Sequence, residues 1–349
     1  IQIARRNPEA LARRGVVAAR KVEIEVHQRG LLDEAAYGRA KAACREALVA
    51  NPDDPWLKER LAWLGLAGAK HRIDRNRDPG PFLADAQEAL AETIRTRPER
   101  AEGWILQSRI AHARALWAES RDRDPRPELR EAAHFAEQAV AQAPGSSQAH
   151  YGLGSALMDA GAYALGHGGD PFADSLRARE HIHRAADLAP ADLGIQSGLA
   201  AINNLLARAR LERGQPVEGA LAEARQAIDR VLAIHPTSYW AHRNAIGTEY
   251  LNAWAAFLAK QDPRPAIGRA EAHERAALKA NADGEGILWE SIFLGKLLVA
   301  YTHPAGSPAR KAALGEAAQA LRSLRRLGTK PSLLRTFQTK MEKLSYFAS

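Results

Sequence analysis

Small residues recur along the chain at a fixed interval and predict a series of similar helices. One set is spaced 46 residues apart: Ala40, Ala86, Ala132, Ala178, Ala224 and Ala270. A second set follows seven residues after the first: Ala47, Thr93, Ala139, Ala185, Val231 and Ala277. A spacing of seven places both sets on one face of an α-helix, where small side chains let a neighbouring helix approach closely. The pattern predicts one such helix in every interval.

Prolines repeat in the same phase and are expected to end these helices. They stand at Pro52, Pro98, Pro144, Pro190 and Pro236, again 46 residues apart. Proline cannot continue an α-helix, and a longer amphipathic stretch such as residues 101–120 follows. Each interval therefore predicts an antiparallel pair of helices. The predicted repeats are about 9–52, 53–98, 99–144, 145–190, 191–236, 237–282 and 283–328.

An Asp-Pro motif also recurs, once in most repeats. Examples are residues 76–85, 121–130, 168–177 and 260–269. Asp124 is a good capping residue, Pro125 ends the first helix, and Pro127 disfavours helical backbone at Arg126. The second helix is therefore expected to begin at or just after Arg126. At 1.5 Å per residue the first helix would then be about 30 Å long. We interpret these motifs as joints between helices and not as binding sites.

The segment AHYGLGSAL (149–157) resembles a tetratricopeptide repeat (TPR). Leu153 and Gly154 match the Leu-Gly pair of that family, and His150 takes the place usually held by an aromatic residue. Trp104 fills the same place one repeat earlier. The family unit has about 34 residues, so these repeats carry extra residues between their two helices. The resemblance implies an all-α, right-handed superhelical solenoid, and residues 331–349 are expected to form a C-terminal capping helix.

The Asp-Pro insert makes the resemblance more specific, because it is typical of one group of TPR arrays. Arrays with similar inserts are appended to bacterial serine/threonine protein kinases and related signalling proteins. The resemblance implies a non-catalytic protein-interaction scaffold, serving as the sensor or docking region of a larger bacterial signalling protein. The chain does not begin with methionine, which fits a piece of something larger. An intramolecular regulatory domain of an enzyme outside this chain is the alternative.

In TPR arrays the first helices line a concave groove, and the resemblance implies a peptide or protein ligand there. Aromatic and hydrogen-bonding residues at those positions suit an extended peptide. The asparagines would either grip a peptide backbone or satisfy polar groups between helices, since asparagine is a poor helix former. The predicted partner-binding residues are Trp63, Arg109, His112, Tyr151, Asn203, Asn204, Arg243, Asn244, Tyr250, Asn252, Trp289 and Lys296.

The sequence offers no chemistry of its own. Its single cysteine, Cys44, excludes an intramolecular disulfide and a cysteine zinc site, and it fits the reducing cytoplasm. Twelve histidines occur without an HExxH motif, and no kinase motif is present. We predict no catalytic residue, no metal and no cofactor, hence no enzyme within the chain. No apolar run reaches the length of a membrane span, about 18 residues.

Charge is concentrated at the C-terminal end. The chain carries a net charge of +8, and residues 310–349 hold nine lysines and arginines against Glu316 and Glu342. This segment is either a solvated helix face or a docking site for an acidic partner, a membrane surface or nucleic acid. Few aromatic residues interleave with these cations, so nucleic-acid binding is the lesser alternative.

Overall fold

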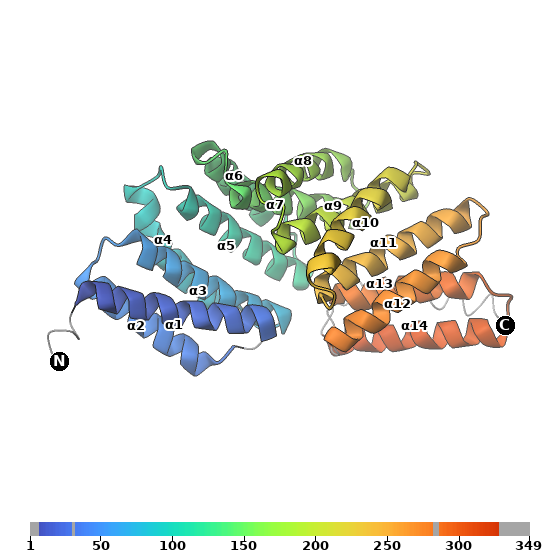
Figure 1. The fold of residues 1–349 in the computed structure, drawn as a ribbon, viewed down its shortest axis with the longest axis horizontal. Coiled ribbons are helices and arrows are strands. Elements are labelled where there is room, and N and C mark those ends of the chain that lie inside the picture. The colour runs from blue at the N-terminus through green and yellow to red at the C-terminus, as the bar shows by residue number, and fades with distance from the viewer. Residues whose placement is uncertain (1–6, 30–31, 282–285, 328–349) are drawn as a thin grey trace. The chain divides into compact units, whose positions relative to one another are not determined.

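A computed structural model describes residues 7–29, 32–281 and 286–327 of the chain. These residues form fourteen α-helices and contain no β-strand (Figure 1). The all-α solenoid of helix pairs expected from the sequence is confirmed. The expected capping helix over residues 331–349 lies outside the described residues.

The helices form seven consecutive pairs, and the first helix is the longer one in every pair except the last, where α13 has 16 residues and α14 has 19. The first helices of the pairs are α1 (Pro8–Arg29), α3 (Pro55–Asp74), α5 (Ala101–Ser120), α7 (Ser147–Gly166), α9 (Leu193–Glu212), α11 (Tyr239–Leu258) and α13 (Gly286–Tyr301). The second helices are α2 (Glu34–Ala50), α4 (Gly80–Thr96), α6 (Arg126–Gln142), α8 (Phe172–Leu188), α10 (Glu218–Ile234), α12 (Arg264–Ala280) and α14 (Pro308–Arg326). Helix α5 has 20 residues and α6 begins at Arg126, as predicted.

The joint inside each helix pair, from the second pair to the seventh, contains a residue in left-handed conformation that the sequence pattern did not predict. Positive φ angles occur at Asn76, Asp122, Gly168, Gly214, Lys260 and Gly306, again 46 residues apart. After each of the first five, the next backbone N–H donates to a carbonyl five residues earlier; Arg123 N to Ala118 O, at 2.9 Å, is one example. This is the Schellman way of ending a helix. Asp124 then accepts from Arg126 N–H at 3.0 Å, which starts the next helix.

The turn between repeats is closed by a side chain six residues after its proline. Trp104 Nε1 donates to Pro98 O at 2.7 Å, and Gln196 Nε2 donates to Pro190 O at 3.1 Å. The His150 and His242 rings make the same contact with Pro144 O and Pro236 O, at 3.1 and 2.9 Å. Different residues can occupy this position because each supplies an N–H to the carbonyl of the turn proline, which lies beyond the end of the helix.

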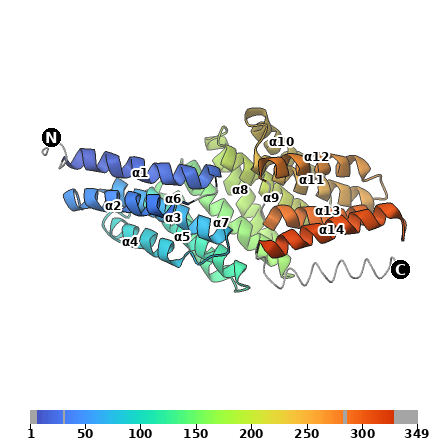
Figure 2. The same cartoon turned by 90° about the horizontal axis from the view of Figure 1, so that it is seen from below.

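The helices pack as two compact units, residues 1–156 and 157–349, and the division falls inside α7. In the first unit α1 packs on α2, α3 on α4 and α5 on α6. In the second, α9 packs on α10, α11 on α12 and α13 on α14 (Figures 1 and 2). The two periodic sets of small residues are buried, each at most 2% exposed, which confirms their predicted place at helix contacts.

Candidate partner-binding surface

In the first unit the predicted residues on successive first helices contact one another. Trp63 on α3 is half-buried, and its indole Nε1 donates to Glu102 on α5 at 2.9 Å. The Arg109 guanidinium lies over the Trp63 ring, 4.6 Å from its centre. Arg109 also donates to Gln148 at the start of α7, at 2.6 Å. Three first helices of this unit are thus connected through one row of indole, guanidinium and amide groups.

A second arginine–tryptophan pair precedes the first along α3. Trp56 is 68% exposed, and the Arg100 guanidinium lies 5.1 Å from its ring centre. Arg100 makes a two-pronged bond to Glu59, with both N–O distances at 2.9 Å. The Glu59 residue is only 3% exposed, and burial raises the pKa of its carboxyl despite the arginine. Trp56, Glu59 and Trp63 share one face of α3 through their helical spacing.

Helix α3 is connected to α1 by a carboxylate that binds arginines of both helices. Glu23 accepts from Arg60 on α3 through both of its oxygens, at 3.1 and 3.0 Å. It also accepts from Arg20 on its own helix at 3.1 Å. Two guanidinium groups therefore cover one carboxylate that is 8% exposed.

His112 and Tyr151 complete the predicted residues of the first unit. Both are half-buried, on α5 and α7. The Tyr151 backbone carbonyl accepts from the Ser155 hydroxyl at 2.8 Å, inside its own helix. Their place on first helices agrees with the prediction, and their binding to a partner stays a prediction.

In the second unit, two predicted asparagines connect α9 to α11. Asn204 Nδ2 donates to the Asn244 backbone carbonyl at 3.0 Å, and Asn244 Nδ2 donates to the Ser197 carbonyl at 2.9 Å. The Thr248 hydroxyl lies 2.8 Å from Asn204 Oδ1. Both amides satisfy backbone groups of a neighbouring helix, the second of the two alternatives raised by the sequence.

The other polar residues of this set differ in exposure. Asn203 is fully buried and donates to Leu199 O at 3.0 Å within α9, whereas Asn252 is half-buried on α11. Arg243 is half-buried; its guanidinium lies 4.8 Å from the Trp240 ring centre and 3.2 Å from Asn244 Oδ1. Arg243 and Trp240 thus reproduce in this unit the arginine–tryptophan pairing of the first.

Tyr250, Trp289 and Lys296 lie inside the second unit, at 3%, 9% and 5% exposure. Tyr250 donates a short hydrogen bond to Glu274, and burial raises the pKa of its phenol. Lys296 lies 2.8, 3.4 and 3.0 Å from Glu271, Glu274 and Glu316. Burial lowers the pKa of Lys296, but these carboxylates outweigh it and hold the pKa above its usual value. All three residues are buried, and Tyr250 and Lys296 bind carboxylates within the chain. They are therefore not part of the proposed partner-binding surface.

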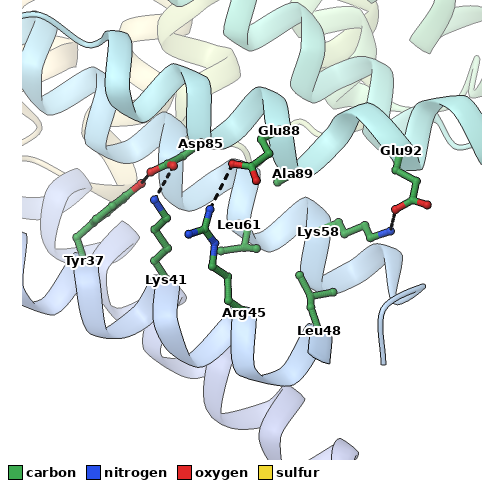
Figure 3. A pocket seen from close by; sticks show the side chains of 10 residues that line it. All are labelled: Tyr37, Lys41, Arg45, Leu48, Lys58, Leu61, Asp85, Glu88, Ala89 and Glu92. Carbon is green, nitrogen blue, oxygen red and sulfur yellow. Dashed lines mark hydrogen bonds and ion pairs between the residues drawn. The ribbon is translucent and has the colours of Figure 1, made fainter. Parts of the chain in front are cut away.

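A cleft of about 240 Å³ lies on the other side of α3, between the second helices α2 and α4 (Figure 3). Its apolar floor is Leu48, Leu61 and Ala89. Every charged residue that lines it has an opposite charge across the cleft: Lys41–Asp85 at 2.5 Å, Arg45–Glu88 at 3.3 Å and Lys58–Glu92 at 2.7 Å. Arg179 and Glu223 occupy the same repeat positions as Lys41 and Asp85. This pairing recurs as a device that joins neighbouring repeats.

Within the described ranges no group of three or more His, Cys, Asp or Glu side chains is placed to hold a metal ion. Cys44 is fully buried, and burial raises the pKa of its thiol to about 11. No described helix combines the length and apolarity that crossing a membrane requires. Of the basic C-terminal residues, Lys311, Arg322, Arg325 and Arg326 are exposed on α14, Arg310 is buried, and the rest lie outside the described residues.

Comparison with known proteins returns TPR structures. A thermophilic TPR protein of Thermus thermophilus is 21% identical over 65% of this chain and 95% of its own, with a TM-score of 0.42. Yeast Tom70 is 14% identical over 90% of this chain and 55% of its own, with a TM-score of 0.43. The C-terminal part of a Cytophaga hutchinsonii TPR repeat-containing protein is 12% identical over 88% of this chain and 99% of its own, with a TM-score of 0.44.

No family model matches the chain, and no curated protein matches its sequence. At TM-scores below 0.5 the structural likenesses add nothing to what the helices themselves show. The described residues form an all-helical array of repeated helix pairs.

Proposed function

We propose that this chain is a non-catalytic scaffold that binds another protein through the first helices of its first unit. The observation that carries the proposal is the pair of arginine–tryptophan stacks, Trp56–Arg100 and Trp63–Arg109, on one face of α3. Tryptophan and arginine are the residues that contribute most often to binding energy at protein interfaces. Trp56 is 68% exposed, so a partner that covers its indole would gain the free energy of burying that apolar surface.

The surface is held in place by its own contacts. Glu59 and Glu102 bind Arg100 and Trp63 at 2.9 Å, so the guanidinium and indole groups are ordered before a partner arrives. Such preorganisation lowers the entropy lost on binding. We favour this unit over the second because Tyr250, Trp289 and Lys296 there are buried, whereas Trp56 in the first unit is 68% exposed.

We further propose that the scaffold is the sensor or docking region of a larger bacterial signalling protein. The recurring Asp-Pro joints, with their resemblance to kinase-associated arrays, support this context. The full reading frame around the chain tests it directly: a signalling domain in the same frame is expected, and a frame that ends with these repeats would contradict it.

Affinity capture with the whole chain tests partner binding. The wild type is compared with Trp63→Ala and Arg109→Ala together, and with Arg45→Gln as the matched control. Arg45 pairs with Glu88 on the second-helix side and is 52% exposed. A specific partner is expected to be retained by the control and lost by the double variant. Equal retention by all three proteins would contradict the proposed surface.

A further inference from the structure

Second helices contact the preceding repeat through one recurring position. Asp85 on α4 binds Lys41 on α2, and Glu223 on α10 binds Arg179 on α8, both at 2.5 Å. The two carboxylates occupy the same place in the 46-residue unit, three repeats apart. Their side chains are 22% and 34% exposed. In these two repeats the position is therefore largely covered by the helix pair that precedes it.

The same position of α2 lies open to solvent. It is Arg39, 46 residues before Asp85, and its side chain is 72% exposed. Among the described residues α1 and α2 form the first helix pair, at one end of the first unit (Figure 1). Seven residues after Arg39, and so on the same side of α2, the Glu46 side chain is 55% exposed. This side of α2, the Arg39–Glu46 face, has one charge of each sign.

The Arg39–Glu46 face is complementary to itself. Arg39 and Glu46 are equally far along the helix from the point between Ala42 and Ala43. If two copies of α2 packed antiparallel about a two-fold axis at that point, Arg39 of each copy would meet Glu46 of the other. Ala42, which is exposed, would lie beside the axis, where its small side chain lets the helices approach closely. One arginine and one glutamate thus supply two ion pairs.

From this complementarity we infer that the chain forms a symmetric homodimer through the Arg39–Glu46 face of α2. The ion pairs already present fit the arrangement. Arg39 lies 3.7 Å from Asp33, and Glu46 binds Arg14, with all four side chains more than half exposed. Across the axis the charges would alternate in the order Asp33, Arg39, Glu46 and Arg14. Each group keeps its partner and joins a network, which stabilises more than an isolated surface pair does.

The rival occupant of this face is a helix of another protein, which would leave the purified chain monomeric. The structure favours a second copy because the two opposite charges are placed symmetrically about Ala42 and Ala43, a placement that a different helix does not require. The interface is also separate from the proposed partner-binding surface, since Trp56 and Trp63 belong to α3. A dimer would therefore present that surface twice.

Sedimentation equilibrium of the whole chain measures the dimer Kd. Arg39→Glu and Glu46→Arg should each raise it about tenfold or more, because each variant sets like charges against each other at both ion pairs. A mixture of the two variants should recover dimerisation, since their charges are then opposite at both points. Arg95→Glu, 74% exposed on α4, is the matched control and should leave the Kd unchanged. Unfolding midpoints show whether each variant is folded.

A cysteine cross-link provides a second measurement that leaves the charges in place. Ala42→Cys should form a disulfide-linked dimer under mild oxidation, because the two copies of position 42 would adjoin at the axis. Gln226→Cys, exposed at the same repeat position on α10, should not. The native Cys44 is buried.

The inference fails if the wild-type chain stays monomeric at every concentration. A dimer that neither single variant weakens uses another surface and also rejects it. No recovery in the mixture, or equal cross-linking of Ala42→Cys and Gln226→Cys, rejects the antiparallel pairing of Arg39 with Glu46. Affinity capture through Trp63 and Arg109 tests the proposed function separately, so either idea can fail alone.

Discussion

His242 on α11 and His273 on α12 face each other with their Nδ1 atoms 2.9 Å apart. The ring centres are 5.2 Å apart, so each nitrogen points along the line between the rings. His242 Nε2 lies 2.9 Å from Pro236 O and must donate to it. In the neutral pair His242 Nδ1 is then the acceptor and His273 Nδ1 the donor. If both rings were protonated, the two Nδ1–H groups would point at each other and repel.

The pair should make the second unit sensitive to mild acid. Burial first, and the neighbouring His242 second, lower the pKa of His273, and they outweigh Glu249 and Asp229, which act the other way. The unfolded chain therefore takes up a proton near pH about 6.5 that the folded chain resists. Stability is fully present above that pH and falls as the pH drops from 7.5 to 5.5.

Urea unfolding midpoints at pH 7.5 and 5.5 measure this effect. His273→Gln should reduce the pH dependence relative to the wild type, while His134→Gln, an exposed substitution on α6, should keep it. An unchanged dependence in His273→Gln would show that the pair does not govern acid sensitivity.

Gly295→Ala should destabilise the second unit. A Cβ at this position would lie 2.1 Å from Cζ of the buried Tyr250 ring, so α13 could not keep its contact with α11. Overpacking of this kind costs about 1–3 kcal/mol. Gly315→Ala on α14 is the matched control, since its Cβ would meet nothing within 4 Å. There alanine should stabilise the helix by about 0.5–1 kcal/mol. Chemical denaturation of both variants gives the comparison, and equal effects would disprove the close contact.

Glu249 separates two like charges on neighbouring second helices. It accepts from Arg225 on α10 at 2.7 Å and from Arg269 on α12 at 2.9 Å, and its pKa is lowered because the arginines outweigh burial. Glu249→Gln should cost about 1.5–3 kcal/mol, the range for hydrogen bonds to charged groups. Part of the loss should return at high salt, which screens the two arginines. Glu88→Gln, whose side chain is 71% exposed, should change stability by less than about 0.5 kcal/mol.

Gln196→Leu tests the contact that closes the turn between repeats. Gln196 is 1% exposed, and leucine would leave the Pro190 carbonyl without this N–H donor. The expected loss is about 1–3 kcal/mol, read from the shift in urea midpoint. Gln226→Leu, at an exposed position of α10, serves as the control. Equal midpoints for the two variants would show that this hydrogen bond does not stabilise the fold.

Much of the fold was predictable because helix signals are local. The proline phase, the small residues and the cap at Asp124 gave the start of α6 at Arg126 and the 20-residue α5. The left-handed position was missed because Asn76, Asp122, Gly168 and Lys260 differ in type and share only a backbone angle. These positions are nevertheless 46 residues apart, the same spacing as that of the prolines and small residues.

The candidate site was less predictable because spacing gives a helix face but not its neighbours. Trp63 and Arg109 were both predicted, yet their stacking depends on how α3 packs against α5. Tyr250 shares its repeat position with His112 and Asn204 but is buried, because Gly295 lets α13 close over it. The carboxylate of Glu23, which binds Arg20 and Arg60, was not singled out, since a buried glutamate looks like any other in the sequence.

The central claim is that the first helices of the first unit, and not its second helices, meet the partner. Site-specific photo-cross-linking measures this directly, with a photoreactive phenylalanine analogue placed at Trp56 in one protein and at Glu88 in another. Both positions are exposed, on α3 and α4. We predict that the captured partner cross-links from position 56 and not from position 88. Cross-linking from position 88 alone, or equally from both, would contradict the account.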